Sequence, residues 1–393
     1  MKRIGLYLGF PPQGGGAFQY AASLLVALRA LPTADYRAVV AHAHPAWAER
    51  LQRDSIGIES HAVAPDRRDT AIRLLLRLGM PARTWRRALA SRIGGVERQL
   101  TRLGCDIWIF PAQDYLAYSM PGPTIGTIHD LMHRYEPSFP EVSALGLYSR
   151  RERHYLNTCR NATAILVDSQ TGKQHVLDAY GIADDRIHIL PYVAPPYIHQ
   201  RDAPLGFDER YRLPTQYLFY PAQFWQHKNH VNLIRALAVA KKKLPALSLV
   251  LVGSPKNNSK AMKEEVYGLG MSSAVTILGY VPDDDMAELY RRSQGLIMPT
   301  FFGPTNIPPL EAMATGTPMA LSDIYAMREQ SREAAIYFDP ASVDAIAAAM
   351  IKLVEDVSTR GRLLANGTAR SAELSQSAFN DRFASILRAA MPP

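Results

Sequence analysis

Short runs of apolar residues alternate along most of the chain with longer stretches of helical periodicity. This alternation is typical of βα units that build parallel sheets, because strands buried on both faces read as continuous apolar runs. The first series predicts strands at 4–8, 38–41, 107–110, 124–127, 164–167 and 187–190. The second series predicts strands at 217–220, 247–252, 275–278, 295–298, 318–321 and 335–338, with helices at 231–243, 286–293 and 343–357 among those between them. The pattern therefore predicts an α/β protein with two doubly wound sheets.

A proline-rich segment separates the two series of strands. Pro191, Pro195 and Pro196 are followed by a largely polar stretch to about Leu213, and prolines stiffen a connector because they cannot join a central strand ladder. We expect the linker near 192–204, a first Rossmann-like domain at 1–195 and a second at 205–372. The terminal segment 373–393, with a helix at 375–390, is expected to pack back on the first domain. Two such domains facing across a cleft would place the carboxyl ends of their strands at the ligand site.

The composition fits two ordinary globular domains. The chain has 393 residues, of which 47% are hydrophobic and 20% charged, values that disfavour disorder. Cys105 and Cys159 are too few for a disulfide framework and lack metal-ligand spacing. Prolines and glycines follow the first apolar run at once, and nowhere do about 18 uninterrupted apolar residues occur. We therefore expect a cytoplasmic protein without a secretory signal or a membrane-spanning helix.

Positive charge is concentrated between Arg67 and Arg102. The net charge is +8, and this segment holds only Asp69 and Glu97 against ten arginines. Such a stretch attracts nucleic acid, lipid head groups or acidic glycans, although it also fits a solvated helix face. No nucleic-acid-binding module surrounds it. Apolar side chains interleave with the arginines and favour peripheral attachment to an anionic membrane surface, on the inner face of the cytoplasmic membrane; they are Leu74, Leu75, Leu76, Leu78, Met80 and Trp85.

A glycine-rich loop follows the first predicted strand. Gly14, Gly15 and Gly16 allow a close approach of the backbone to a ligand and let a helix begin with exposed N–H groups. The spacing is not that of a dinucleotide-binding fingerprint. The loop fits either a site for a phosphate or sugar oxygen, or a tight turn without a ligand.

His129 and Asp130 stand at the end of another predicted strand. A histidine and a carboxylate at the carboxyl end of a strand can hydrogen-bond sugar hydroxyls and shape the charge near a reacting carbon. The alternative is a structural histidine.

Lys228 lies just before the helix predicted from Val231. There its ammonium group and the N–H groups of the helix end could together hold a diphosphate, whereas the alternative is a solvated lysine. His227 and His230 are spaced for one helical face, but no third metal ligand is evident.

The most informative run extends from Thr300 to Pro318. Gly303 and Pro304 predict a turn after a strand, and two further prolines at 308 and 309 suit the start of a helix. Amides at 305–307 would then face an anion at the start of that helix. Glu311 falls one turn in, where its carboxylate could accept bonds from two adjacent ribose hydroxyls. The alternative for Glu311 is an exposed helix residue.

With these motifs in place, most of the chain resembles the family-four retaining glycosyltransferases of the GT-B fold, and in particular a mannosyltransferase-like subgroup with PAQFW-x-HKNH and FGPTN-x-PPLE patterns. The resemblance is carried by the glycine-rich loop and by 127–131, Asp168-Ser169, Lys228-Asn229, Gly253, 278–282 and above all 308–318.

The resemblance implies a role for each part of the site. Glu311 would bind the donor ribose, Lys228 would neutralise the diphosphate, and His129 would sit beneath the transferring sugar, these three forming the catalytic set. Asp130 would lie nearer the acceptor. The donor site would comprise Gly14, Gly15, Gly16, Gln223, Lys228, Gly279, Tyr280, Val281, Thr305, Asn306, Ile307 and Glu311.

Two positions depart from the family pattern. The family often has two glutamates seven residues apart, and the first falls here on Gly303. It also often has an arginine five or six residues before the lysine, where this chain has Gln223 and Ala222. Neutralisation of the diphosphate would then depend on Lys228 and on helix-end amides.

No metal or other cofactor is expected. Asp283, Asp284 and Asp285 could be mistaken for metal-binding carboxylates, but they precede a helical segment whose dipole they would complement.

The sequence therefore predicts a retaining, nucleotide-sugar-dependent glycosyltransferase. The resemblance favours transfer of mannose from GDP-mannose to a glycan or lipid-linked glycan in surface polysaccharide or lipopolysaccharide synthesis. Two alternatives stay open: a sugar-nucleotide epimerase on the same fold, and a non-catalytic subunit that binds a nucleotide-sugar.

Overall fold

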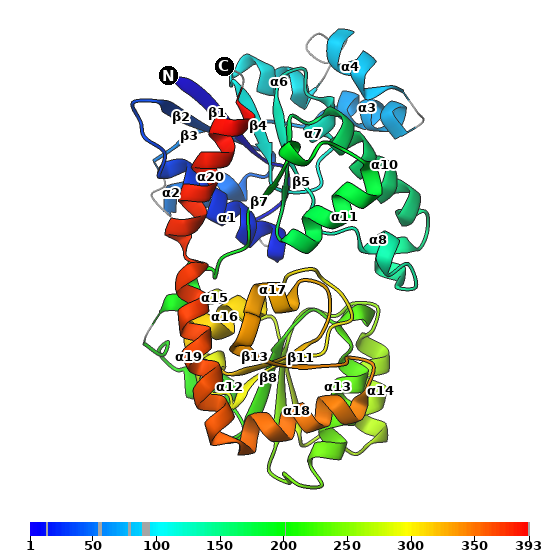
Figure 1. Ribbon diagram of the computed structural model, residues 1–393, viewed down its shortest axis with the longest axis vertical. Helices are drawn as coiled ribbons and strands as arrows, with labels where there is room; N and C mark the ends of the chain where they lie inside the picture. Colours follow the sequence, from blue (N-terminus) through cyan, green and yellow to red (C-terminus); the bar gives the residue numbers. More distant parts are fainter. Residues whose placement is uncertain (13–14, 54–56, 78–79, 89–94, 201, 392–393) are drawn as a thin grey trace. The chain divides into compact units, whose positions relative to one another are not determined.

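The computed structural model describes residues 1–391 except 13–14, 54–56, 78–79, 89–94 and 201. The chain divides into two compact units (Figure 1). Unit 1 comprises Met1–Pro137, Val142–Tyr192 and Gln376–Pro393, and unit 2 comprises Ser138–Glu141 and Val193–Ser375.

Unit 1 is built on a seven-stranded sheet in the order β3-β2-β1-β4-β5-β6-β7, with every strand pair parallel. The chain moves outward from β1 in one direction and from β4 in the other, so the order reverses between these two strands. The strands are β1 (Lys2–Leu8), β2 (Tyr36–His42), β3 (Glu59–Ala62), β4 (Ile107–Phe110), β5 (Thr124–Thr127), β6 (Ala164–Val167) and β7 (Ile187–Ile189).

Helices cover this sheet, and the last helix of the chain belongs to unit 1. Gln376 at the start of that helix donates to the carbonyl of Ser23 in α1 at 3.1 Å, and Phe379 packs edge-on against Tyr20. The unit 1 helices are α1 (Gly16–Arg29), α2 (Ala46–Arg53), α3 (Arg67–Arg77), α4 (Ala82–Ala88), α6 (Val96–Arg102), α7 (Leu116–Ser119), α8 (Met132–Tyr135), α10 (Leu147–Asn161), α11 (Gln170–Tyr180) and α20 (Gln376–Ala390).

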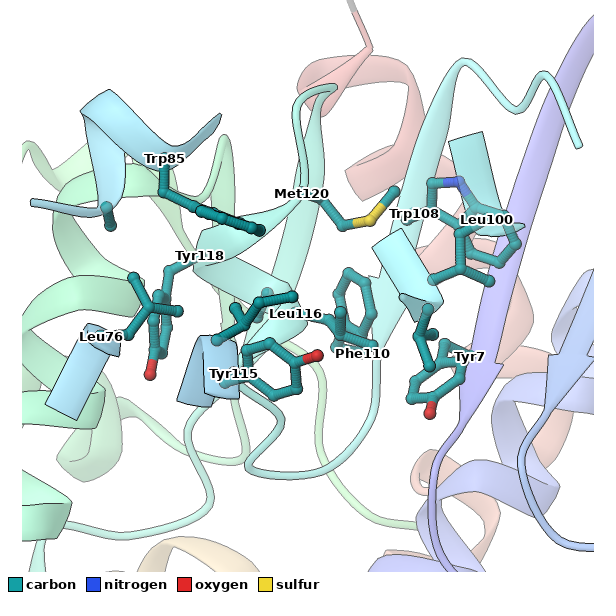
Figure 2. Close-up of a cluster of buried hydrophobic side chains, with 14 of the residues drawn as sticks. Tyr7, Leu76, Trp85, Leu100, Trp108, Phe110, Tyr115, Leu116, Tyr118 and Met120 are labelled. Carbon is teal, nitrogen blue, oxygen red and sulfur yellow. The ribbon is translucent and has the colours of Figure 1, made fainter. Parts of the chain in front are cut away.

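The apolar side of the basic segment packs into the core of unit 1. Leu76 of α3 and Trp85 of α4 are only 3% and 1% exposed, and they point toward Tyr118 within an aromatic cluster (Figure 2). The Arg86 guanidinium donates to carbonyl groups, including those of Met120 at 2.5 Å and Gly122 at 2.8 Å. Leu76 and Trp85, two of the apolar residues that favoured membrane attachment, are therefore core residues and not part of an exposed surface. Leu78 lies outside the described residues.

Unit 2 is built on a six-stranded parallel sheet in the order β10-β9-β8-β11-β12-β13, which reverses direction between β8 and β11. Its strands are β8 (Tyr217–Pro221), β9 (Ser248–Val252), β10 (Val275–Gly279), β11 (Gly295–Met298), β12 (Met319–Ser322) and β13 (Ala335–Phe338). Its α-helices are α12 (Phe207–Tyr211), α13 (His230–Ala240), α14 (Ser259–Gly268), α15 (Asp283–Arg291), α16 (Ile307–Thr315), α17 (Met327–Ser331), α18 (Val343–Glu355) and α19 (Val357–Glu373).

The α/β class with two doubly wound sheets is confirmed, and each predicted apolar run contains a strand. The edge strand β3 was not predicted, and neither was the helix α19. Among the described residues, no helix combines the length and the apolar character needed to cross a membrane.

Candidate functional site

The loops that leave β8 and β11 are tied together at the point where the sheet of unit 2 reverses direction. The carbonyl of His227 accepts from the amide of Phe301 at 2.8 Å and from the Thr300 hydroxyl at 3.1 Å. Lys228 Nζ donates to Asn306 Oδ1 at 3.1 Å. Because ligands of doubly wound sheets bind where the strand order reverses, this pair of loops is the first place to look for a site.

The backbone around Lys228 is held from several sides. Residues Gln226–Lys228 form a short 3₁₀ turn, and Asn229 follows in the left-handed region with φ 59°. Asparagine tolerates this conformation better than most residues. The buried Asn229 amide donates to the carbonyls of Pro299 and Pro340, and the Tyr220 hydroxyl donates to the Lys228 carbonyl at 3.0 Å. The lysine therefore extends from a fixed base.

The start of α16 offers few free amides. Asn306 is the N-cap, and Pro308 and Pro309 in the first turn carry no N–H. The Asn306 amide itself donates to Gln330 Oε1 at 3.0 Å. Ile307 is then the only residue of 307–309 with an N–H, so this helix start offers an anion fewer amide donors than an ordinary one does. Thr305 precedes the N-cap.

Gly303 adopts a conformation that a glutamate would strain. Its φ is 118°, and a Cβ atom at this position would lie 2.8 Å from Asn306 Nδ2. The side-chain amide of Asn306 bridges the two sides of the loop: its Nδ2 donates to the Gly303 carbonyl at 3.3 Å, and its Oδ1 accepts from Lys228. Where the family often has a glutamate, this chain therefore has a glycine in a loop whose conformation lets Asn306 contact Lys228.

Glu311 is buried in unit 2 and accepts from two tyrosines. It is 3% exposed; the Tyr290 hydroxyl donates to Oε2 at 2.6 Å and the Tyr197 hydroxyl donates to Oε1. Burial raises the pKa of Glu311, and the two hydroxyl donors oppose that rise. Neither tyrosine was predicted as a site residue.

Backbone contacts join the loops after β8, β9 and β10. The Gly253 amide donates to the Gly279 carbonyl at 2.9 Å, and a Cβ at Gly253 would lie 2.2 Å from the Ala222 carbonyl oxygen. Gly279 has φ 70°, Tyr280 is 83% exposed and Val281 is buried. These residues lie two strands from Lys228 at the same edge of the sheet.

Gln223 is an exposed neutral residue where the resemblance expects an arginine. Its side-chain oxygen accepts from the Trp225 indole at 2.9 Å. Lys256, from the loop after β9, lies over the Trp225 ring at 5.1 Å. Lys256 brings a second cation to this loop and was not selected from the sequence.

Glu141 supports the turn that carries Lys228. Its Oε1 accepts from the backbone amide of His227 at 2.9 Å and lies 2.5 Å from the His227 ring Nδ1, while Oε2 accepts from Asn257 at 2.9 Å. Burial alone would raise the Glu141 pKa, but these bonds bring it down to about 2. The His227 ring stacks on Phe302 at 3.8 Å. His227 therefore has a packing role.

In unit 1, His129 follows β5 with both ring nitrogens engaged. Nε2 lies 2.8 Å from the Pro111 carbonyl, and Nδ1 lies 2.6 Å from the Tyr192 hydroxyl. Burial lowers the His129 pKa, so the ring is neutral, with Nε2–H as donor and Nδ1 as acceptor. The ring can hold a sugar hydroxyl only after one of these bonds breaks.

Asp130 is paired with Arg151 of α10. Asp130 Oδ1 accepts from the Arg151 guanidinium and from the Met132 amide at 2.9 Å. Arg151 also donates to the Tyr155 hydroxyl at 3.3 Å. Asp130, which the sequence predicted on the acceptor side, is thus held in an ion pair with Arg151 just after β5.

The glycine-rich loop is described in part. Gly14 lies outside the described residues, whereas Gly15 is the N-cap of α1 with φ 65° and ψ −137°, and Gly16 opens the helix. This region of backbone space is accessible essentially to glycine alone. The backbone conformation, and not a lack of space, therefore requires glycine at position 15, since a Cβ there would meet nothing within 4 Å.

Asp283, Asp284 and Asp285 open α15, as predicted from the helix dipole. Asp285 is buried and accepts from Arg210 at 2.8 Å and Tyr211 at 2.5 Å. Within the described part of the chain, no group of three potential ligands is arranged to hold a metal ion.

Comparison with known proteins assigns the class. Residues 14–192 match the family model "Glycosyltransferase Family 4", and residues 207–370 match "Glycosyl transferases group 1". The first match covers the sheet of unit 1 from β2 to β7, and the second covers the whole sheet of unit 2. The chain belongs to the glycosyltransferases of the GT-B fold.

Relatives agree with this class, and solved structures agree with the fold. The chain is 27% identical over 282 residues to O-antigen chain mannosyltransferase B of Escherichia coli, covering 67% of this chain and 72% of that protein. It is 27% identical over 270 residues to the serotype-specific mannosyltransferase WbdA of Escherichia coli, but this covers only 32% of that protein's length. Anabaena HepE in complex with UDP and glucose superposes with a TM-score of 0.75 at 16% identity, over 99% of this chain and all of that one. Sucrose-phosphate synthase of Thermosynechococcus elongatus superposes with a TM-score of 0.73 at 16% identity, over 99% and 98%.

Proposed function

We propose that the protein transfers a sugar from a nucleoside-diphosphate sugar to a glycan or lipid-linked glycan, with retention of anomeric configuration, in the assembly of a surface polysaccharide. The observation that carries the proposal is the contact between Lys228 Nζ and the N-cap residue Asn306, 3.1 Å apart where the sheet of unit 2 reverses direction. A cation at a helix start is suited to a diphosphate.

Each residue then has a distinct task. Lys228 and the Ile307 amide stabilise charge on the leaving diphosphate, and Thr305 and Asn306 line it. Glu311 accepts bonds from the ribose hydroxyls. Gly279, Tyr280 and Val281 lie beside the base, while Gln223 and the glycine-rich loop complete the donor site.

The reaction proceeds by a front-face displacement. The bond from the anomeric carbon to the diphosphate oxygen breaks, the acceptor oxygen bonds to that carbon from the same face, and the acceptor proton passes to the departing diphosphate. His129 favours the oxocarbenium-like centre through its backbone carbonyl, since both of its ring nitrogens are engaged. Asp130 serves the acceptor.

We propose mannose as the transferred sugar, because several relatives are named as mannosyltransferases. GDP as its carrier rests on the resemblance of the sequence alone. A UDP-sugar is the alternative, as the structures of HepE contain UDP, UDP with glucose, or UDP-glucose.

A thermal-shift panel of GDP-, UDP- and ADP-sugars identifies the donor, because a ligand that binds only the folded state raises Tm by mass action. We expect the largest shift with GDP-mannose. Nucleoside-diphosphate release that depends on an added acceptor, and that persists in EDTA, supports metal-independent transfer. Conversion of the free sugar would indicate an epimerase, and binding without release would indicate a non-catalytic subunit.

We further propose that α3 binds the surface of the membrane at which the lipid-linked acceptor is presented. Leu74 and Leu75 are 54% and 43% exposed on the helix that also exposes Arg67, Arg68 and Arg73. Exposed leucines flanked by arginines favour an anionic interface.

Flotation with anionic liposomes at low salt tests this surface. We expect the protein to float, and the double variant Leu74→Ser, Leu75→Ser to lose most of the floated fraction. The matched charge control is Lys243→Glu with Lys260→Glu, at exposed positions of unit 2, which should float as the wild type does. Equal flotation of the leucine variant, or no flotation of the wild type, contradicts the proposal.

A further inference from the structure

The two tyrosines that bond Glu311 have different surroundings. Tyr290 on α15 is fully buried, and its ring packs edge-on against Phe219 with centroids 4.8 Å apart. Its hydroxyl also lies 3.4 Å from the carbonyl oxygen of Pro308. Tyr197 lies in the short 3₁₀ segment Pro196–His199, within the stretch predicted as the linker, and it is partly exposed. Tyr290 is therefore fixed by the core, whereas Tyr197 is the partner of Glu311 that is partly exposed to solvent.

The two tyrosines occupy part of the acceptor capacity of the Glu311 carboxylate, one position on each oxygen. An ionised carboxylate has about four acceptor positions on its two oxygens, and the hydroxyls of Tyr197 and Tyr290 occupy one on each. Glu311 itself is 3% exposed. Because Tyr290 is buried and Tyr197 is partly exposed, we infer that a ribose hydroxyl approaches Oε1 from the side of Tyr197.

We propose that Tyr197 is a donor-displaced gate: its hydroxyl holds, in the free protein, the position on Glu311 Oε1 that a ribose hydroxyl takes in the complex. Tyr290 keeps its bond to Oε2 and is the positioning residue that fixes the carboxylate plane. This inference rests on the proposed function, in which Glu311 binds the donor ribose.

The exchange conserves the number of hydrogen bonds at Oε1. One neutral hydroxyl donor to a charged acceptor replaces another, so a ligand with a correctly placed hydroxyl displaces Tyr197 at small net cost. Removing the Tyr197 hydroxyl then removes a competitor, whereas removing the Tyr290 hydroxyl removes a support. The same chemical change on the two tyrosines has opposite effects on affinity.

Titration calorimetry of GDP and UDP against the full chain measures this difference. We expect Tyr197→Phe to bind the preferred nucleoside diphosphate roughly fivefold to tenfold more tightly than wild type, and Tyr290→Phe to bind it about tenfold more weakly, each change corresponding to about one hydrogen bond to a charged group. Tyr197→Leu removes the same hydroxyl without an aromatic ring and should also bind more tightly. Tm of each variant confirms that it is folded.

A second measurement distinguishes an effect on the Glu311 carboxylate from a general loss of packing around the substituted tyrosine. Each Phe variant loses one donor to the ionised form, so the acid limb of the kcat/KM profile should move to higher pH in both. Weaker or unchanged binding by Tyr197→Phe, or an unmoved acid limb, overturns the gate while leaving the ribose assignment intact. If Glu311→Ala binds nucleoside diphosphate as wild type does, the ribose assignment itself fails, whatever the tyrosine variants show.

Discussion

Lys228→Met lowers kcat for sugar transfer by about 100-fold, a loss of the size seen when one preorganised group that stabilises transition-state charge is removed. The charge on the leaving diphosphate grows as the glycosidic bond breaks, so a cation beside it acts more strongly on the transition state than on the bound donor. The effect is large here because the start of α16 cannot compensate. Pro308 and Pro309 have no N–H, and the Asn306 amide is directed at Gln330.

Initial rates at saturating donor, with a parallel inhibition constant for the nucleoside diphosphate, measure the Lys228 effect. The Lys228→Met change should weaken the binding of the product nucleoside diphosphate by a smaller factor than it lowers kcat. Lys243→Met is the matched control, because Lys243 is an exposed lysine of unit 2 that pairs with Glu355. A Lys228→Met rate within threefold of wild type would place the diphosphate elsewhere, with Lys256 as the next cation to examine.

The apolar pattern predicted the central strands well because both of their faces are buried. It missed β3 for the opposite reason. This edge strand reads Glu59-Ser60-His61-Ala62 and none of its residues is fully buried. Its glutamate is held by ion pairs with Arg3 and Arg37 rather than by apolar packing. Polar edge strands of this kind carry no alternating signal for a sequence pattern to detect.

For the candidate site, the sequence pointed to residues that a loop or helix start displays locally. Lys228, Asn306 and Glu311 were selected because prolines, glycines and strand ends mark their loops. Their partners were missed because contacts across a long sequence separation leave no local pattern. Tyr197 lies 114 residues from Glu311, and Glu141 lies 86 residues from His227.

Gly303 shows how the structure changes the meaning of a departure from a family pattern. In the sequence, the missing glutamate weakens the inference about the donor sugar. In the structure, its φ of 118° and the close approach of Asn306 mean that a longer side chain would require a different loop. The Asn306 contact with Lys228 depends on the loop that is present. The glycine at 303 and the contact that holds Lys228 therefore belong to the same loop conformation.

Glu311→Gln lowers kcat/KM for the donor by at least tenfold, because an amide accepts hydrogen bonds through one oxygen and carries no charge. Glutamine is preferred to alanine for this test. Alanine would remove the acceptor that the hydroxyls of Tyr197 and Tyr290 share. A buried donor left without its acceptor, as the Tyr290 hydroxyl would be, costs about 1–3 kcal/mol of folding free energy and confounds the kinetics. The control is Glu355→Gln at an exposed ion pair of unit 2, which should leave kcat/KM unchanged.

The pH dependence gives this prediction a sign. Burial raises the Glu311 pKa above its ordinary value, so the carboxylate takes up a proton as pH falls through that raised pKa and can no longer accept from both ribose hydroxyls. Wild-type kcat/KM should therefore decline on the acid side at a higher pH than an exposed glutamate would produce. In Glu311→Gln that limb should flatten, since the variant has no proton to gain there. An acid limb shared by wild type and variant would show that another group controls it, and Glu311 would then lose its assignment as the acid that binds the ribose.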